Sequence, residues 1–467
     1  MNGAFSGIKP KLLPPLDHEF RPAALANRDF LNAVKASGKC EPLTIALERS
    51  DGLISTYNTL VYRDGSGHEE ESCFYAERVV KTLLWIRGGW KVIVGGPEYV
   101  GEYIRTAYKP GGLREFDAAF MSRVYEKPFE VIVTETDKVP VSKEGAMPVG
   151  RHLDGCRIGF DAGGSDIKVS AVVDGSAVYS EEMVWYPKLQ SDPEYHYNEI
   201  LAAMKAAAAH MPRVDAIGVS SAGIYINNRA MVASLFVKIP EDLFDKQVKD
   251  IFIRVQKEFG GVPLQVANDG DVTALAGAMD LNDTKVLGIA MGTSQAAGYV
   301  DLDGNITGWL NELAFVPVDF YEGAMVDEWS GDYGCGVKYF SQDAVIKLAA
   351  PAGIQLDEKL SPAQKLKAVQ KLLENGDECA AAIFESIGCY LGYAIAHYAE
   401  FYEMQHILIL GRVTSGKGGE LIVNMAEEVL KQEFPELYRG IRIHLPDETS
   451  RRVGQSIAAA SLPEIMR

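Results

Sequence analysis

Apolar residues recur along the chain in two patterns, as short runs or alternating stretches and as longer stretches with helical spacing. The clearest short stretch is residues 157–173, where the apolar run 158–160 ends in Asp161 and an alternating stretch follows a turn at 162–165. This arrangement is typical of two strands joined as a β-hairpin. Because two glycines occupy the turn, few side chains surround its tip.

The two patterns alternate over nearly the whole chain and predict an α/β fold. Residues 138–155 are rich in proline and glycine and are predicted to form a linker. The order of elements in 43–97 resembles that in 157–223. This similarity indicates either a degenerate repeat or the general likeness of α/β segments, and the second is favoured. Strands are expected at 43–47, 56–62, 90–94, 129–134, 214–220, 264–267, 285–291, 405–410 and 441–445, and helices at 22–36, 74–87, 99–108, 195–210, 244–259, 272–279, 380–404, 421–434 and 453–460.

Composition narrows the class of protein. A chain of 467 residues is expected to form more than one domain. The net charge of −18 opposes nonspecific binding to nucleic acid. Residues 1–20 lack the apolar run of a signal peptide, and no run of 18 apolar residues predicts a membrane span. Six scattered cysteines without a CxxC spacing are typical of reduced thiols, so we expect a cytoplasmic protein. From the net charge and the lack of a membrane span, we expect neither nucleic-acid nor membrane partners.

The glycine turn after Asp161 has the composition of a phosphate-binding loop. Gly163, Gly164 and Ser165 leave backbone N–H groups open to an anion, and clustered N–H groups bind phosphate. Asp161 at the strand end is placed to hold Mg²⁺ through water, because magnesium retains much of its hydration shell. A plain hairpin turn is the alternative, and it would be favoured if this turn stood alone.

Three further strand ends carry small or polar residues. They are Ser221 to Gly223, Asn268 with Asp269, and Gly292-Thr293-Ser294. Ligands of open α/β sheets bind at the carboxyl ends of the strands. A carboxylate there can orient a hydroxyl for phosphoryl transfer and accept its proton late. An N-cap role is the common alternative for Asn268 or Asp269, but two glycine turns favour catalysis by Asp269.

Four segments together resemble the ROK family of the sugar kinase and actin-like superfamily. DAGGSDIK at 161–168 resembles the family's DxGGTxxK motif, with serine in place of threonine, and 266–279 resembles its NDAN segment. Residues 286–300 resemble its second phosphate motif, with Ser294 in place of glycine, and 407–413 resemble the strand and glycine near adenosine. The resemblance covers about residues 155 to 465.

This resemblance implies two actin-like ATPase (ribonuclease H-like) domains with a cleft between them. We expect them at 155–280 and 281–467, with an additional N-terminal α/β region at 1–150. ATP and Mg²⁺ are the implied cofactors, and a sugar-like molecule is the implied substrate. The resemblance assigns Asp269 as the base and Asp161 to Mg²⁺ through water. It assigns Gly163, Gly164, Ser165, Lys168, Gly292, Thr293, Ser294 and Gly411 to the nucleotide, and Asn268, Glu312, Ser221 and Gly223 to the substrate.

The segment 311–337 departs from the family pattern. Glu312 is kept, but Phe315 stands in place of a zinc-binding histidine and Val337 in place of a sugar-binding glutamate. Cys335 alone remains of three cysteines, and a structural zinc needs about four ligands, so no zinc is predicted. We expect packing of Phe315, Trp329 and Tyr333 to hold this loop instead.

The leading hypothesis is therefore an ATP-dependent kinase that phosphorylates a hydroxyl of a sugar or sugar-like compound. A non-catalytic nucleotide- or sugar-sensing protein, or a ROK-type regulator, is the alternative. The first 60 residues hold seven basic and six acidic side chains and no basic recognition helix, which disfavours a DNA-binding repressor. Residues 1–150 are expected to cap the kinase domains, to mediate a homodimer or to bind a partner.

Overall fold

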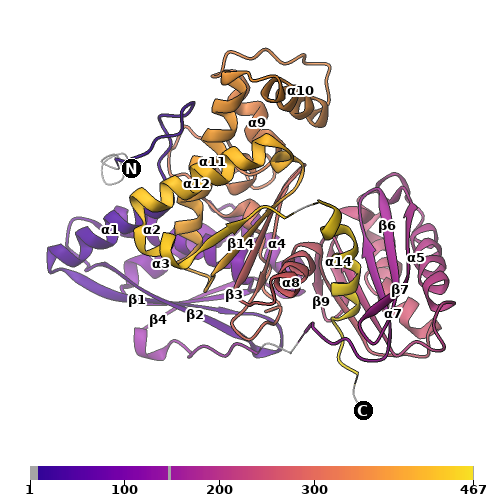
Figure 1. Ribbon diagram of the computed structural model, residues 1–467. Helices are drawn as coiled ribbons and strands as arrows, with labels where there is room; N and C mark the ends of the chain where they lie inside the picture. Colours follow the sequence, from indigo (N-terminus) through magenta and orange to yellow (C-terminus); the bar gives the residue numbers. More distant parts are fainter. Residues whose placement is uncertain (1–8, 146–148, 447, 466–467) are drawn as a thin grey trace. The chain divides into compact units, whose positions relative to one another are not determined.

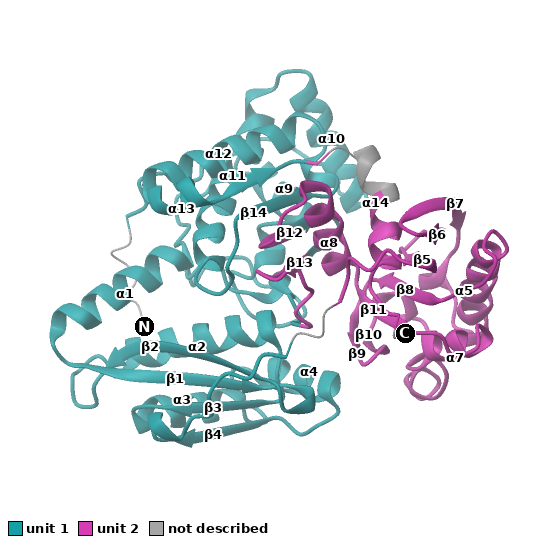
Figure 2. Ribbon diagram, turned by 60° about the horizontal axis from the view of Figure 1, so that its bottom comes forward, with its two compact units in different colours: residues 1–145, 289–296, 309–445 teal, residues 146–288, 297–308, 446–467 magenta. Residues whose placement is uncertain are grey.

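The computed structural model of the chain describes residues 9–145, 149–446 and 448–465 and has the expected α/β architecture (Figure 1). The chain forms two compact units (Figure 2). Unit 1 comprises residues 1–145, 289–296 and 309–445, and unit 2 comprises residues 146–288, 297–308 and 446–467.

The N-terminal part of unit 1 is a four-stranded sheet with helices. Its strand order is β2 (Ile54–Tyr62), β1 (Cys40–Glu48), β3 (Lys91–Gly95) and β4 (Glu130–Thr134). The helices are α1 (Ala23–Ser37), α2 (Glu69–Arg87), α3 (Glu98–Tyr108) and α4 (Glu115–Tyr125). We did not predict α4, although Phe116, Phe120 and Val124 repeat at helical spacing.

The pairing of β1 shows that this sheet is no copy of the sheet in unit 2. β1 pairs antiparallel with both β2 and β3. The corresponding strand of unit 2, β5 (Cys156–Ala162), is antiparallel to β6 (Asp166–Val173) but parallel to β8 (Ala216–Ser221). The similar order of elements in 43–97 and 157–223 is therefore a general likeness of α/β segments.

Unit 2 is built on a five-stranded sheet in the order β11 (Leu264–Asn268), β8, β5, β6 and β7 (Ser176–Val184). The predicted hairpin at 157–173 is confirmed as β5 and β6. We did not predict β7, because its residues are mostly exposed and lack apolar alternation. A small hairpin of β9 (Ile224–Ile226) and β10 (Arg229–Val232) follows β8.

Helices pack against both faces of the unit 2 sheet (Figure 1). Side chains of α5 (Pro193–Ala208) and α7 (Ile251–Glu258) join those of the strands in one hydrophobic core. Helix α14 (Glu448–Ala460) contacts β5, β8 and α8 (Asp269–Leu281). Gly218 allows this close approach, because a Cβ there would lie 1.7 Å from the carbonyl oxygen of Ala459.

A second sheet has the order β13 (Gln295–Val300), β12 (Val286–Met291), β14 (His406–Leu410) and β15 (Arg442–His444). Helices of this part of the chain are α9 (Gln342–Ala349), α10 (Pro362–Glu374), α11 (Glu378–Tyr398), α12 (Lys417–Glu433) and α13 (Pro435–Gly440). Among the described residues, α11 alone is long and apolar enough to cross a membrane, but 78% of its apolar window is buried inside the protein. A core helix of a globular protein has the same composition, and α11 packs along α12.

Residues 1–145 are an integral part of unit 1. Helix α1 packs on α11. Phe20 is fully buried, with its ring centroid 4.7 Å from that of Tyr390 on α11. The hydroxyl of Tyr390 donates a hydrogen bond to Asp17 at 2.6 Å. The N-terminal region therefore completes the core of unit 1.

The predicted packing of segment 311–337 is partly right. The ring of Phe315 stacks on Trp85 of α2, with centroids 4.1 Å apart. Tyr333 lies under the guanidinium of Arg78, whose Cζ is 5.2 Å from the ring centroid. The expectation for Trp329 was wrong, because its side chain is 69% exposed.

A buried ionic cluster supplies the rest of the support for this segment. Asp332 accepts from Arg78 at 3.0 Å and forms ion pairs with Lys81 at 3.0 Å and Arg114 at 2.9 Å. The cluster consists of three cations and three carboxylates, all in unit 1: Arg78, Lys81, Arg114, Glu77, Asp117 and Asp332. Burial opposes the charge of Lys81, but Asp117 and Asp332 outweigh burial and raise its pKa. Balanced charges of this kind avoid the cost of an unpaired buried ion.

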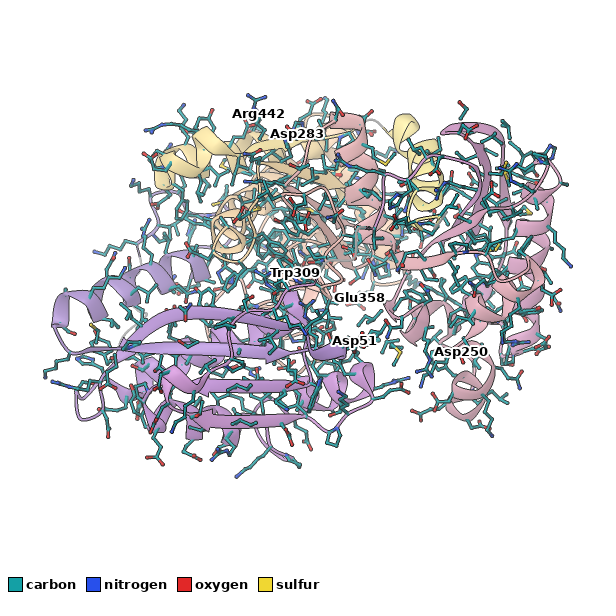
Figure 3. The ribbon with its side chains drawn as sticks, turned by 90° about the horizontal axis from the view of Figure 1, so that it is seen from below. Asp51, Asp250, Asp283, Trp309, Glu358 and Arg442 are labelled. Carbon is teal, nitrogen blue, oxygen red and sulfur yellow. The ribbon has the colours of Figure 1, made fainter. Side chains whose placement is uncertain are left out.

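A stacked arginine also links α2 to the loop after β13. The Arg87 guanidinium lies 3.3 Å from the ring centroid of Trp309, which is labelled in Figure 3. Trp309 also donates a hydrogen bond to Glu144. Arg87 and Glu144, both from the N-terminal region, therefore hold this loop through the ring face and the N–H of Trp309.

Candidate functional site

The turn between β5 and β6 forms the first candidate phosphate site. The N–H of Gly163 donates to the carbonyl of Asp166 at 2.9 Å and closes the turn. The buried indole of Trp185 donates to the Gly163 carbonyl at 2.8 Å. Gly164 and Ser165 are exposed. A Cβ on Gly164 would meet only Lys188, at 3.6 Å, so no packing requirement of the protein explains the glycine.

Asp161 lies at the end of β5, directly before this turn. Its carboxylate is only 5% exposed, and its Oδ1 accepts from the hydroxyl of Ser220 at 2.6 Å. Lys168, its partner across the hairpin, places Nζ 3.8 Å from Oδ2. Burial raises the pKa of Asp161 to about 6. The Ser220 hydrogen bond and Lys168 oppose this rise, whereas the charge of Asp269 adds to it.

Asp269 is the first residue of α8 and follows β11 directly. Its side chain is half-buried, and the N–H of Gly270 donates to its Oδ1 at 3.0 Å. Burial raises the pKa of Asp269, while the Gly270 N–H and the charge of Lys188 favour the ionised form. One strand, β8, separates β5 from β11, so the two strand ends lie about 10 Å apart.

Asn268 is the N-cap of α8, as the structural alternative for this residue anticipated. Its side-chain oxygen accepts from the Gly270 N–H at 2.8 Å. Its amide nitrogen donates to the carbonyl of Gly223 at 2.8 Å. Asn268 therefore fixes the strand end that carries Asp269.

Ser221 and Gly223 shape the neighbouring end of β8. The hydroxyl of Ser221 is fully buried and accepts from Tyr225 at 2.7 Å. Gly223 has φ 133° and a Cβ there would lie 2.5 Å from the Val232 carbonyl, so only glycine fits without strain. In this structure Ser221 supports the loop, and its hydroxyl is not presented to solvent.

The second candidate phosphate turn is Gly292-Thr293-Ser294, between β12 and β13, within unit 1. The Gly292 N–H donates to the Ser294 carbonyl at 2.9 Å. Thr293 and Ser294 are exposed, and a Cβ on Gly292 would meet only the Ser294 carbonyl, at 3.8 Å. Arg412 donates to the Thr293 hydroxyl at 2.8 Å, which brings a guanidinium to the turn.

Gly411 ends β14 beside the second turn. Its φ is 102°, and a Cβ would lie 2.3 Å from the carbonyl oxygen of Met291. The glycine therefore allows the ends of β12 and β14 to meet. This contact positions Arg412, the next residue, next to Thr293.

Glu312 is half-buried in unit 1, and its backbone N–H donates to the carbonyl of Trp85 at 2.9 Å. The carbonyl of the next residue, Leu313, lies beside Gly336. The side chain of Gln295, the first residue of β13, also lies beside Gly336. The segment that carries Glu312 thus packs near the start of β13, just after the second turn.

The predicted residues fall into two groups. Unit 2 brings together Asp161, the first turn, Lys168 and the strand ends at Ser221, Gly223, Asn268 and Asp269. Unit 1 brings together Gly292, Thr293, Ser294 and Gly411. Sequence analysis missed Ser220, Lys188 and Arg412. Ser220 is an ordinary strand residue and Lys188 is an exposed residue of the short 3-10 helix Pro187–Leu189, so neither had a signal, whereas Arg412 lies within the family-like segment 407–413.

The residues present fit a hydrated magnesium ion. Within the described part of the chain, no group of three or more His, Cys, Asp or Glu side chains could hold a metal. Mg²⁺ in phosphoryl-transfer enzymes is commonly bound by one or two carboxylates together with water and substrate phosphates. Asp161 supplies one such carboxylate at the edge of a glycine turn.

Comparison with protein families matches residues 157–455 to the model described as the ROK family. The chain belongs to the ROK family. This match confirms the resemblance drawn from the four sequence segments. No curated protein sequence matches the chain significantly.

Solved structures of ROK proteins share the fold. The ROK hexokinase of Thermus thermophilus has 17% sequence identity and a TM-score of 0.52, over 66% of this chain and 98% of the hexokinase. A ROK transcriptional regulator, described as a homologue of the E. coli MLC protein, has 18% identity and a TM-score of 0.50, over 66% and 79%. A ROK glucokinase from Streptomyces griseus, in complex with glucose and AMPPNP, has 20% identity and a TM-score of 0.47, over 65% and 98%. The similarities to the hexokinase and to the regulator confirm the actin-like ATPase fold for the ROK region, so a kinase and a regulator share this fold.

Proposed function

We propose that this ROK protein is an ATP-dependent kinase that transfers a phosphoryl group to a hydroxyl of a sugar or sugar-like molecule. The observation that most supports this function is the pair of carboxylates Asp161 and Asp269, which lie at two strand ends of one sheet, beside a glycine turn. Burial raises the pKa of both side chains, and shifted carboxylates at strand ends are typical of functional sites.

The two carboxylates have different surroundings and are assigned different roles. Asp269 is half-buried at the start of α8, where the helix dipole and the Gly270 N–H favour its charged form. It would orient the attacking hydroxyl and accept its proton late in the transfer. Asp161, held by Ser220, would bind the water shell of Mg²⁺. Magnesium, when bound, would neutralise charge that develops on the phosphates.

The glycine turns are proposed to bind ATP. The first turn, with Lys168 beside Asp161, would contact phosphate oxygens through the N–H groups of Gly164 and Ser165. The second turn would do so through Gly292, Thr293 and Ser294, with Gly411 near the adenosine. Lack of any packing reason for glycine at 164 and 292 supports this proposal, because close approach of a ligand is the remaining use.

The substrate is proposed to contact Asn268 of unit 2, beside the loop that Ser221 and Gly223 shape. Glu312 is the proposed substrate residue of unit 1. Phe315 and Val337 are apolar where the family resemblance places a histidine and a glutamate. Glucose and N-acetylmannosamine are therefore not assumed as substrates.

A screen of ADP release over neutral hexoses, amino sugars and polyols tests the proposal. We expect at least one acceptor to stimulate release, with kcat reduced at least a hundredfold in Asp269→Asn. Asp242→Asn removes an exposed carboxylate of the same unit and is the matched control. Stimulated activity that survives Asp269→Asn unchanged would refute the mechanism.

A sensor that binds nucleotide or sugar without turnover is the second candidate. The altered segment 311–337 and the engagement of Ser221 and Asn268 within the protein favour it. Calorimetry separates the two functions, since a sensor would bind ATP or a sugar tightly and release no ADP with any acceptor. For either function, we propose a cytoplasmic protein without nucleic-acid or membrane partners.

A further inference from the structure

We propose that Lys188 of unit 2 binds the γ-phosphate of ATP and stabilises the phosphoryl group during its transfer. This inference rests on the proposed kinase function and adds a residue to its site. Lys188 belongs to the short 3-10 helix Pro187–Leu189, which follows β7. It lies outside the four segments that resemble the ROK family, so no motif assigns it a role.

The side chain of Lys188 reaches the tip of the first glycine turn. A Cβ on Gly164 would lie 3.6 Å from Cε of Lys188 and 3.7 Å from its Nζ. Gly164 and Ser165, whose N–H groups are proposed to bind phosphate, are exposed at this tip. Contacts between an ammonium group and a phosphate oxygen span about 2.8 Å. The Lys188 ammonium group is therefore within reach of a phosphate that the turn holds.

The charge of Lys188 also acts on Asp269, the proposed base. It favours the ionised carboxylate and opposes the rise in pKa that burial causes. Lys188 is therefore close both to the proposed phosphate turn and to the carboxylate that would orient the attacking hydroxyl. In phosphoryl transfer the γ-phosphoryl group lies between the nucleotide and that hydroxyl. This position favours a contact with the γ-phosphate over one with the phosphates that ADP also carries.

Lys188 has no counter-ion among the residues that the structure describes. The other lysine of the turn, Lys168, lies 3.8 Å from Asp161 and 3.7 Å from Asp166, so carboxylates partly neutralise its charge. The charge of Lys188 remains available for a ligand. A triphosphate is strongly anionic and is the proposed ligand of this turn.

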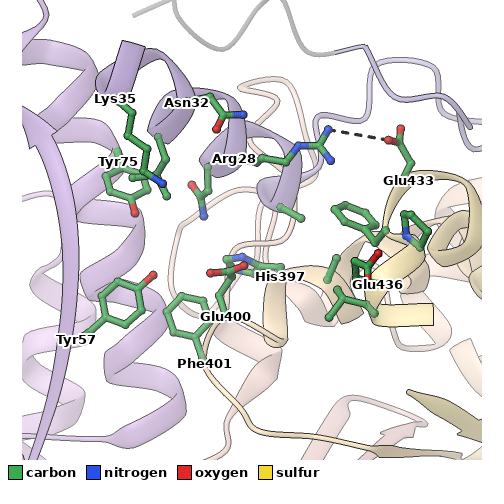
Figure 4. A pocket seen from close by; sticks show the side chains of 17 residues that line it. Arg28, Asn32, Lys35, Tyr57, Tyr75, His397, Glu400, Phe401, Glu433 and Glu436 are labelled. Atoms are coloured by element: carbon green, nitrogen blue, oxygen red, sulfur yellow. Dashed lines mark ion pairs between the residues drawn. The ribbon is translucent and has the colours of Figure 1, made fainter. Parts of the chain in front are cut away.

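An exposed cation of unit 1 shows the contrast. Arg28 lies at a cavity beside α1, where its guanidinium is 4.0 Å from the Glu433 carboxylate (Figure 4). The same guanidinium is 5.4 Å from the ring centroid of Phe434. The Arg28 side chain is 44% exposed and nevertheless has both partners. A ligand can bind Lys188 without breaking an ion pair, whereas at Arg28 it would have to compete with Glu433.

Neighbouring residues fix the segment around Lys188 on the glycine turn. The buried indole of Trp185 donates to the Gly163 carbonyl at 2.8 Å. Pro187 is buried, and its carbonyl oxygen lies 3.0 Å from Nε2 of the fully buried His196. The backbone of Lys188 is therefore held in place before a ligand binds. A charge positioned in advance needs little reorganisation during the reaction, which makes it effective in stabilising a transition state.

The role of Lys188 in the proposed transfer is electrostatic. The oxygen of the acceptor hydroxyl forms a bond to the γ-phosphorus as the bond from that phosphorus to the bridging oxygen of ADP breaks. The electron pair of the broken bond stays on ADP, and the hydroxyl proton passes to Asp269. Lys188 keeps its proton throughout and balances the negative charge on the γ-phosphoryl oxygens.

Calorimetry of the full chain with ATP and with ADP tests this assignment without an acceptor. Lys188→Met keeps an unbranched side chain but removes the charge, whereas Lys188→Arg keeps the charge. We expect Lys188→Met to weaken ATP binding about tenfold and ADP binding less than about threefold, because only ATP carries the γ-phosphate. Lys188→Arg should retain the preference of the wild type for ATP over ADP. Lys205→Met, at an exposed lysine of α5, is the matched control and should change neither affinity.

The ratio of the two affinities decides the outcome. A ratio in Lys188→Met equal to that of the wild type, whether both affinities fall together or neither changes, would overturn the proposal and leave the proposed function intact. Failure of the wild type to bind ATP would instead overturn the proposed function together with this inference. With an acceptor that stimulates ADP release, kcat of Lys188→Met should fall about tenfold or more, while Lys205→Met should match the wild type.

Discussion

The Arg78 guanidinium binds both carboxylate oxygens of Asp332, with Nη1 3.0 Å from Oδ2 and Nη2 3.3 Å from Oδ1. The two residues are separated by 254 positions in the chain. Arg78 belongs to α2 of the N-terminal region, and Asp332 belongs to the segment where the family resemblance places zinc ligands. In this chain an ionic cluster and the Trp85–Phe315 stack hold that segment.

Asp332→Ala should be strongly destabilising. It would leave Arg78, Lys81 and Arg114 buried with too few carboxylates, and breaking a buried ion pair costs about 3–5 kcal/mol. Urea unfolding measures this change. Glu358→Ala removes an exposed carboxylate of the same unit and should change stability by less than about 0.5 kcal/mol. Equal stability of the two variants would show that the cluster contributes nothing.

A fragment of residues 151–467 should be insoluble or unfolded in unit 1. The fragment lacks Phe20, which packs on Tyr390, and Trp85, which stacks on Phe315. The buried faces of Tyr390 and Phe315 would therefore be exposed to water. Circular dichroism and size-exclusion chromatography of the fragment test this, with full-length protein as the control. A soluble, fully active fragment would contradict an integral role of the N-terminal region.

Asp161→Asn should stabilise the protein at neutral pH. Burial raises the folded-state pKa of Asp161 from 3.8 to about 6, so the folded state binds the proton more tightly than the unfolded state. This tighter proton binding stabilises the folded state fully below about pH 4, and the stabilisation is lost as the pH rises through about 6. Asparagine removes the buried charge, and the gain at pH 8 is at most about 3 kcal/mol.

Melting temperatures from pH 4 to pH 8, measured with EDTA, test this dependence. The difference between Asp161→Asn and wild type should grow up to about pH 6–7 and then level off. Asp242→Asn, at an exposed site, should show no such trend. A difference that is independent of pH would rule out the raised pKa as its cause.

Gly292→Ala should separate ligand binding from folding. Gly292 has no positive φ, and an added Cβ would meet only the Ser294 carbonyl at 3.8 Å, so stability should be unchanged or higher by up to about 1 kcal/mol. If the turn binds phosphate, the affinity for ATP should nevertheless fall, as calorimetry would show. Gly411→Ala is the contrasting variant. It should destabilise the protein, because its Cβ would collide with the Met291 carbonyl.

Arg412→Ala should raise the KM for ATP about tenfold, which corresponds to about 1.4 kcal/mol, with a smaller effect on kcat. Its guanidinium donates to Thr293 at the second turn and is exposed, so it is placed to bind a phosphate oxygen. Arg439→Ala removes an exposed arginine elsewhere in unit 1 and should leave KM unchanged. An unaltered KM in Arg412→Ala would exclude contact with the nucleotide.

The sequence determined those features that depend on local pattern. The apolar run before Asp161 and the alternation after it predicted β5 and β6, and the glycines between them predicted the turn. The motif at 266–279 placed Asn268 and Asp269 at a strand–helix junction, where Asn268 caps α8. Four such segments sufficed to identify the ROK family. Each is a short local pattern, and the four occur along the chain in the order expected for the family.

Only the tertiary structure decided which distant residues meet. Ser220 and Asp161, Arg412 and Thr293, and Arg78 and Asp332 contact one another through strand pairing and helix packing that no local pattern encodes. The tertiary structure also decides which side chains are exposed. Trp329 is aromatic and would be expected in the core, yet it lies at the surface. Arg78, Lys81 and Arg114 are buried and form ion pairs with carboxylates. Periodicity shows which face of an element is apolar, but the partner of that face is set by the packing of the whole chain.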